Sequence, residues 1–145
     1  TLNSVCAPVA PSILAASRKV SGTVSKKPFA IRYPSPEDAE YTIRTYLAPS
    51  NNLDGDKVEL RYALQADEAE PIVVNALPKG YIAGDYWERQ WCRAVVINAH
   101  MNENKVNLTA GTHKLRFYGI DAGVVLQKVV IYRGELPQSY LGPEE

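Results

Sequence analysis

The sequence predicts an all-β fold, an antiparallel β-sandwich of jelly-roll type with one short helix. Apolar and polar residues alternate with a period of two in several short segments, which is typical of half-buried strands. Clusters of Pro, Gly, Asn and Asp separate these segments, and only one stretch has helical spacing. A length of 145 residues suits one domain, because a (β/α)₈ barrel needs about 250 residues.

The N-terminal third is predicted to contain an arm and two short strands. Residues 1–16 have no helical or strand period and are expected to lie along the domain. Since the chain opens at Thr1 without an initiator Met, we expect that its start was processed or trimmed. Strands are predicted at 19–25 and 29–33, and Pro34 and Pro36 end the second.

The strongest strand patterns occupy residues 41–47 and 58–64, with the turn-forming residues 49–56 between them. A short strand follows at 72–75. One helix is predicted over residues 86–98, and the residues that indicate it are the capping pair Asp85 and Glu88 and the spacing-four series Trp87, Trp91 and Val95.

Three more strands complete the predicted sandwich, which spans residues 17–133 and leaves a polar tail at 134–145. They are expected at 105–110, at 113–117 and at 124–132. The last run is apolar on both faces, so we expect a strand central to the sandwich. No internal repeat is visible.

The charges and cysteines exclude several classes of protein. Sixteen basic residues balance sixteen acidic ones, so no overall field favours nucleic acid or an anionic membrane. No apolar stretch reaches the ~20 residues that span a bilayer. Cys6 and Cys92 are too few for a disulfide framework; small buried apolar residues are the favoured interpretation, and a Cys6–Cys92 bridge is the alternative.

Catalysis by this chain is not expected. Glycosidases need two carboxyl groups, but the candidate acids have simpler roles. Asp67, Glu68 and Glu70 form a polar loop, and Asp85 with Glu88 suits a helix start. His100 is expected to close the helix and His113 to share a strand face with apolar residues, so neither marks a triad or a zinc site.

Metal binding is likewise not predicted. Asp54 and Asp56 flank Gly55 in an oxygen-rich loop that resembles a calcium loop, but the spacing is not that of an EF-hand and a tight turn explains the same residues. We therefore expect no cofactor, with a structural calcium ion as the alternative. Asn107-Leu108-Thr109 is a glycosylation sequon placed inside a predicted strand, which makes it a poor acceptor.

A family resemblance is carried by motifs that occur in one order along the chain. They are Leu47-Ala48-Pro49-Ser50-Asn51-Asn52, Arg61-Tyr62-Ala63-Leu64, Trp91 with Val95 and Asn98, Ala110-Gly111-Thr112-His113-Lys114-Leu115-Arg116, Asp121-Ala122-Gly123-Val124-Val125-Leu126-Gln127-Lys128-Val129 and Ser139-Tyr140-Leu141-Gly142-Pro143-Glu144. In this order they resemble the C-terminal domain of glycoside hydrolase family 115, the xylan α-1,2-glucuronidase family. The chain departs from the family pattern at Ala122, where Pro is usual, and the first strand of the pattern, which would precede Leu2, is expected to be missing.

The resemblance implies a galactose-binding-like sandwich similar to carbohydrate-binding modules. It also implies that the catalytic residues lie in an upstream domain, so none is carried over to this chain. The expected partners are that catalytic domain and a plant cell-wall polysaccharide such as glucuronoxylan or arabinogalactan. The expected location is secreted or periplasmic, in a bacterium.

Exposed aromatic residues are the candidates for sugar contact, because their rings offer apolar area to a pyranose. Tyr81, Tyr86 and Trp87 follow a loop broken by Pro and Gly, and Asn51 and Asn52 lie in another loop. Loops at one end of a sandwich come together, so these five residues are predicted to form one rim.

Two hypotheses follow for the function. In the first, the chain is a non-catalytic accessory domain that binds or positions carbohydrate. In the second, it is an interface domain that docks on the catalytic part or dimerises. Trp91 is assigned to the core in either case.

Overall fold

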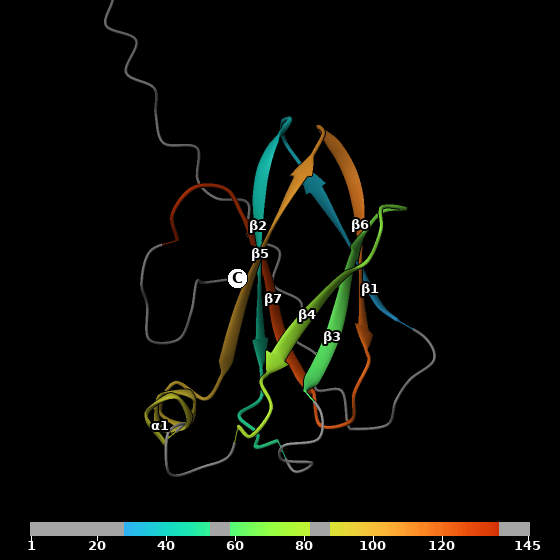
Figure 1. Ribbon diagram of the computed structural model, residues 1–145. Coiled ribbons are helices and arrows are strands. Elements are labelled where there is room, and N and C mark those ends of the chain that lie inside the picture. Colours follow the sequence, from blue (N-terminus) through green and yellow to red (C-terminus); the bar gives the residue numbers. More distant parts are fainter. Residues whose placement is uncertain (1–27, 53–58, 82–87, 137–145) are drawn as a thin grey trace, which may run out of the picture.

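The computed structural model describes residues 28–52, 59–81 and 88–136, and these form a two-sheet antiparallel sandwich with one helix (Figure 1). The elements are β1 (Phe29–Ser35), β2 (Ala39–Leu47), β3 (Leu60–Ala66), β4 (Ile72–Leu77), α1 (Glu88–Val96), β5 (His100–Leu108), β6 (Gly111–Gly119) and β7 (Leu126–Tyr132). The predicted fold class is confirmed. The strand predicted at 19–25 and the arm at 1–16 lie outside the described residues.

One sheet has the order β1-β6-β3-β4 and the other the order β5-β2-β7. Among the described strands, only β3 and β4 are consecutive in the chain and paired within one sheet. The other connections cross between the sheets, and they gather at two ends. We call the end with residues 36–38, 67–71 and 109–110 the turn end, and the end with residues 48–52, 78–81, 97–99 and 120–125 the loop end.

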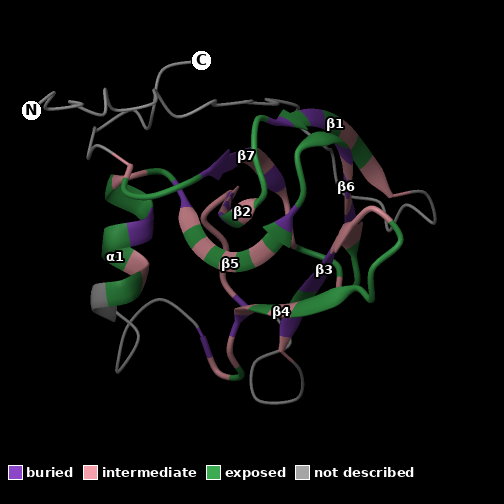
Figure 2. Ribbon diagram, turned by 90° about the horizontal axis from the view of Figure 1, so that it is seen from above, coloured by how far each residue is buried: buried purple, intermediate pink, exposed green. Residues whose placement is uncertain are grey.

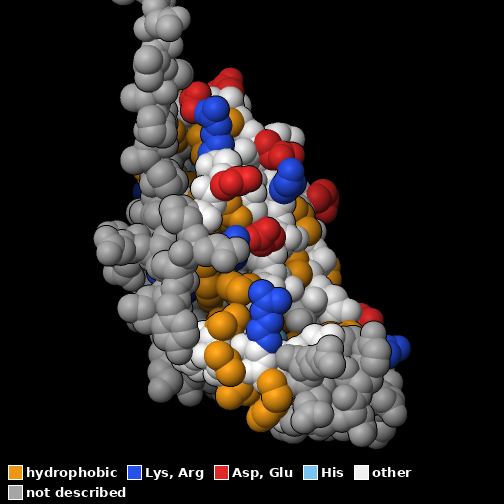
Figure 3. Space-filling view, turned by 90° about the vertical axis from the view of Figure 1, so that its left-hand side faces the viewer, with side chains coloured by type: hydrophobic (Ala, Val, Ile, Leu, Met, Phe, Trp, Pro, Cys, Tyr) orange, Lys and Arg blue, Asp and Glu red, His pale blue; other side chains and the backbone are white. Residues whose placement is uncertain are grey.

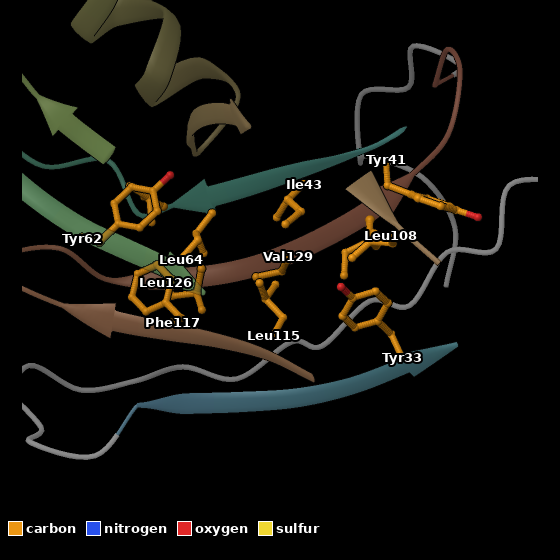
Figure 4. Packing of buried hydrophobic residues seen from close by; sticks show 12 residues of the cluster. Tyr33, Tyr41, Ile43, Tyr62, Leu64, Leu108, Leu115, Phe117, Leu126 and Val129 are labelled. Carbon is orange, nitrogen blue, oxygen red and sulfur yellow. The ribbon is translucent and has the colours of Figure 1, made fainter. Parts of the chain in front are cut away.

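The main core lies between the two sheets and follows from the period-two pattern of each strand (Figures 2 and 4). On β2, Tyr41, Ile43 and Leu47 point inward and are buried. Tyr62 of β3 stacks on Phe117 of β6 with ring centroids 4.9 Å apart. Its hydroxyl pairs with Thr45 Oγ1 at 2.6 Å, so the one polar group of this buried ring is satisfied.

The helix α1 runs from Glu88 to Val96, inside the predicted range of 86–98. It ends in a Schellman motif: Asn98 has φ of 55°, and Ala99 N donates to Ala94 O at 2.9 Å. The predicted apolar face is wrong at Val95, which is 45% exposed, whereas Ala94 is buried. Trp91 is half-buried and packs on a satellite cluster of Leu60, Leu77 and Tyr81, which is separate from the main core. The helix face that turns toward the sandwich therefore contains Trp91 and Ala94, which are three residues apart.

Three other expectations are corrected. His100 begins β5 and does not close the helix, because the Schellman motif already turns the chain at Asn98. Among the described strands β7 is at a sheet edge and β2 is central, although Val129, Val130 and Ile131 are all buried as predicted. An apolar run predicts that both faces of a strand are buried, but a strand at the edge of a sheet can be buried on both faces as well as a central one. Cys92, expected to be buried, is exposed on α1 with a free thiol.

Within the described ranges, no helix is long and apolar enough to cross a membrane.

Candidate functional site

The loop end is held together by hydrogen bonds between segments that are distant in sequence. Ala48 N donates to Val125 O at 2.8 Å, which joins the chain after β2 to the chain before β7. Arg61 N and Nε donate to Asp121 Oδ2 at 2.8 and 2.9 Å, which ties the start of β3 to the chain after β6. These hydrogen bonds hold the connecting segments of the two sheets together as one rim at the loop end.

The two loops with candidate residues also meet at this end. Asn52 N donates to Tyr81 O at 2.7 Å, and Asn52 Nδ2 donates to Pro78 O at 3.3 Å. The side chain of Asn52 is fully buried, so in this structure it holds the two loops together and does not face solvent. Asn51 is half-buried, and its Oδ1 atom is itself buried and accepts no hydrogen bond from the residues that the structure describes.

Tyr81 is 3% exposed, so the expectation that its ring is exposed is wrong. The ring meets His100 edge to face, with centroids 5.2 Å apart, and it packs on Leu60 and Leu77. Burial raises the pKa of the Tyr81 hydroxyl. Burial also lowers the pKa of His100, against the opposing effect of its contact with Ser50 O at 3.4 Å, so this imidazole is neutral at pH 7.

The remaining candidates cannot be placed. Tyr86 and Trp87, and the calcium candidates Asp54 and Asp56, lie outside the described residues. Across residues 28–52, 59–81 and 88–136, no group of three or more His, Cys, Asp or Glu side chains is arranged to hold a metal ion. In the described part of the loop end, a ligand site would therefore consist of polar loop residues such as Asn51, in a loop joined to that of the buried Tyr81.

A charged pair at the turn end was missed by the sequence patterns. His113 Nδ1 lies 2.6 Å from Asp67 Oδ2, and His113 Nε2 lies 2.8 Å from Thr109 O. Both partners are acceptors, so both ring nitrogens must carry protons and His113 is an imidazolium. The hydrogen bond to Asp67 raises the pKa of His113 accordingly.

This pair has a structural role. Asp67 Oδ1 also accepts from Lys114 N at 2.8 Å, so the carboxylate joins the β3–β4 turn to β6. Burial, reinforced by the charge of Asp67, raises the pKa of nearby Tyr33 to about 12. The alternation of β6 predicted that His113 points inward; its acidic partner comes from a turn 46 residues away, which no local pattern reveals.

The chain is similar to one protein family and to several solved structures. The profile of the Glycosyl hydrolase family 115 C-terminal domain matches residues 9–145. No curated sequence matches the chain. A solved family GH115 4-O-methyl-α-glucuronidase, described as specific for decorated arabinogalactans, is 21% identical with a TM-score of 0.60; the match covers 88% of this chain and 16% of the glucuronidase.

Two further structures share the sandwich. A ruminal GH26 endo-β-1,4-mannanase is 14% identical with a TM-score of 0.54, over 90% of this chain and 22% of the mannanase. An exo-β-1,3-galactanase from Phanerochaete chrysosporium is 13% identical with a TM-score of 0.52, over 83% of this chain and 29% of the galactanase. At these identities the two structures show the fold alone, and it is the profile match over nearly the whole sequence that places this chain in the family of glycosyl hydrolase family 115 C-terminal domains.

Proposed function

We propose that this domain is a non-catalytic accessory module that binds polysaccharide at its loop end and holds it near a catalytic domain. The observation that carries the proposal is the joining of the Asn52 and Tyr81 loops at 2.7 Å. This contact brings Asn51 to the same rim as the segment that leads to Tyr86 and Trp87. Amides for hydroxyl groups and rings for the pyranose are what a sugar site requires.

The solved relatives support the choice of ligand class. Each carries this sandwich as a minor part of a longer chain whose name is that of a polysaccharide-cleaving enzyme. The proposed ligands are glucuronoxylan-like or arabinogalactan-like polymers. Placement of the protein outside the cytoplasm, secreted or periplasmic, belongs to the same proposal.

Calorimetric titration with neutral and acidic oligosaccharides tests the loop end. We expect weak binding, with a Kd of roughly millimolar to tens of micromolar. Trp87→Ala and Asn51→Ala should each abolish binding without a change in melting temperature. Asn107→Ala is the control, because Asn107 is exposed on β5 near the turn end. Absence of binding to all the oligosaccharides, or equal loss in the control, contradicts the proposal.

A second candidate function is docking on the catalytic part of the same enzyme. Apolar side chains gather over α1 and the start of β5 (Figure 3), where Val95, Val96 and Met101 are 45%, 66% and 42% exposed. Exposed apolar patches often mark interfaces. If docking is the function, Val95→Ser with Val96→Ser should weaken association with the catalytic part and leave sugar titrations unchanged. Unaltered association would reject this candidate.

A further inference from the structure

The outer face of the β1-β6-β3-β4 sheet carries an uneven set of charges. Tyr33, Leu115 and Leu64 point into the core, so the alternate residues of the same strands point outward. On β1, β3 and β6 the outward positions contain four basic residues and no acidic one. These are Arg32, Arg61, Lys114 and Arg116.

Two of these cations lie side by side, and neither has an acidic partner among the residues that the structure describes. Arg32 and Lys114 are register partners on β1 and β6. Like charges directly opposite each other on a sheet are destabilising. Neither residue forms an ion pair with any residue that the structure describes, whereas Arg61 pairs with Asp121 and Arg116 with Glu68.

On the outer face of the β5-β2-β7 sheet, basic residues form ion pairs with acidic ones. There, Arg44 lies 2.5 Å from Glu103, and Lys105 lies 2.7 Å from Glu40. Figure 3 shows this face, with acidic and basic side chains interspersed. The two outer faces therefore differ in the described residues: Arg44 and Lys105 of the β5-β2-β7 sheet have acidic partners there, whereas Arg32 and Lys114 of the other sheet have none.

An aromatic ring lies on the same outer face, four residues along β6 from Lys114. Tyr118 is half-buried on the outward side of β6, and its hydroxyl donates to Gln65 Oε1 at 2.7 Å. Arg116 lies between Tyr118 and Lys114 along the strand and is held by Glu68 Oε1 at 2.7 Å and by the carbonyl oxygen of Asp67. The register partner of Tyr118 on β3 is Ala63, a small residue that is buried.

We propose that this outer face is a second polysaccharide-binding surface, selective for sugars that carry carboxylates. A pyranose would pack on Tyr118, and uronate groups along the polymer would neutralise Arg32 and Lys114. The charge complementarity selects the ligand: a uronate-decorated polymer supplies counter-ions for Arg32 and Lys114, and a neutral polymer does not. The inference rests on the proposed carbohydrate-binding function and assigns it a surface separate from the loop end.

The test uses the whole 145-residue chain and one polymer in two forms, glucuronate-bearing arabinogalactan and the same polymer after reduction of its carboxyl groups. Affinity electrophoresis compares Arg32→Gln/Lys114→Gln with Lys105→Gln/Arg133→Gln, a control that makes the same change in charge at two exposed cations paired with Glu40 and Glu37. We expect the first pair to weaken binding of the acidic form by about tenfold and the control to leave it unchanged. Binding of the acidic form should also weaken as salt rises.

Three outcomes overturn the inference: equal losses in the two double variants, equal affinity for the acidic and reduced polymers, or equally tight binding of dextran sulfate, which would indicate unselective attraction of polyanions. Asn51→Ala in the same gels separates this inference from the proposed function. Binding that is lost in Asn51→Ala but retained in Arg32→Gln/Lys114→Gln rejects the sheet surface alone. No retardation by any polymer rejects both.

Discussion

His113 and Asp67 make the turn end of the sandwich sensitive to pH. The hydrogen bond to Asp67 raises the pKa of His113 above 6.5. Burial opposes ionisation of Asp67, but the hydrogen bonds from His113 and Lys114 outweigh it and lower the pKa of Asp67 below 3.8. The His113 contribution is complete below pH 6.5 and is lost as the pH rises through the higher pKa of the folded state. The Asp67 contribution is present above pH 3.8 and is lost as the pH falls through its lower folded-state pKa.

His113→Gln should therefore destabilise the domain most between pH 3.8 and 6.5, where both charges are present. The difference in melting temperature between parent and variant should shrink at pH 8 and above. Thermal melts from pH 4 to pH 9 measure it. His100→Gln is the control, because His100 has a lowered pKa and its effect should not peak in that window. A constant difference across the pH range would mean that His113 is not an imidazolium.

The hydroxyl of Tyr62 is the second residue-scale test. It is buried and pairs with Thr45 Oγ1 at 2.6 Å, so Tyr62→Phe removes a partner from a buried hydroxyl. The expected cost is about 1–2 kcal/mol in the free energy of unfolding. Tyr118→Phe is the matched control, because its hydroxyl lies on the outer face and water can replace Gln65; we expect a change within about 0.5 kcal/mol. Urea titrations that show equal losses would reject the buried pair.

Strands were predictable in this chain because each carries its own period-two pattern. The predicted segments 41–47, 58–64 and 72–75 fall on β2, β3 and β4 within a few residues. The prediction at 105–110 found only the end of β5, because Asn102 and Asn104 occupy inward positions and break the apolar alternation. The helix was located, but its buried face was not, because the spacing of four from Trp91 leads to the exposed Val95, whereas the buried residue is Ala94.

The candidate site was predictable only as a meeting of loops. Sequence patterns placed Asn52 and Tyr81 in connections that share one end, and the structure joins them by a hydrogen bond. They did not reveal that both side chains are buried, since burial in a loop depends on residues from other connections. The cations Arg32 and Lys114 were overlooked for a similar reason: β6 shows its own alternation, but pairing with β1 joins residues far apart in sequence.

The helix α1 provides a test at the scale of one element. Trp91 of this helix is half-buried and packs on the satellite cluster. Trp91→Ala should lower the free energy of unfolding by about 2 kcal/mol, less than the 3–5 kcal/mol of a fully buried Trp. Val96→Ala is the control, because Val96 is 66% exposed and should change stability little. An unchanged unfolding midpoint for Trp91→Ala would show that α1 is anchored by other residues.

At the scale of the whole molecule, several carboxylates of the described sandwich are already engaged by cations, which does not suit glycoside cleavage. The space between the sheets is filled by buried side chains. Hydrolysis needs two carboxyl groups roughly 5–9.5 Å apart across a bound sugar. In the described ranges, Glu40, Glu103 and Asp121 are engaged with Lys or Arg, and Asp67 is engaged with His113.

The purified chain should therefore release no glucuronic acid from uronate-bearing oligosaccharides, even if it binds them. Binding does not require cleavage. A rim of loop amides and a cationic sheet face can hold a polymer, whereas cleavage also needs an acid and a base placed at the same glycosidic bond. The measurement is chromatographic detection of free uronic acid after long incubation, with a full-length family 115 enzyme as the positive control. Release by the 145-residue chain above the blank, abolished when any one of its carboxylates is replaced, would place chemistry in this sandwich and contradict its role as an accessory module.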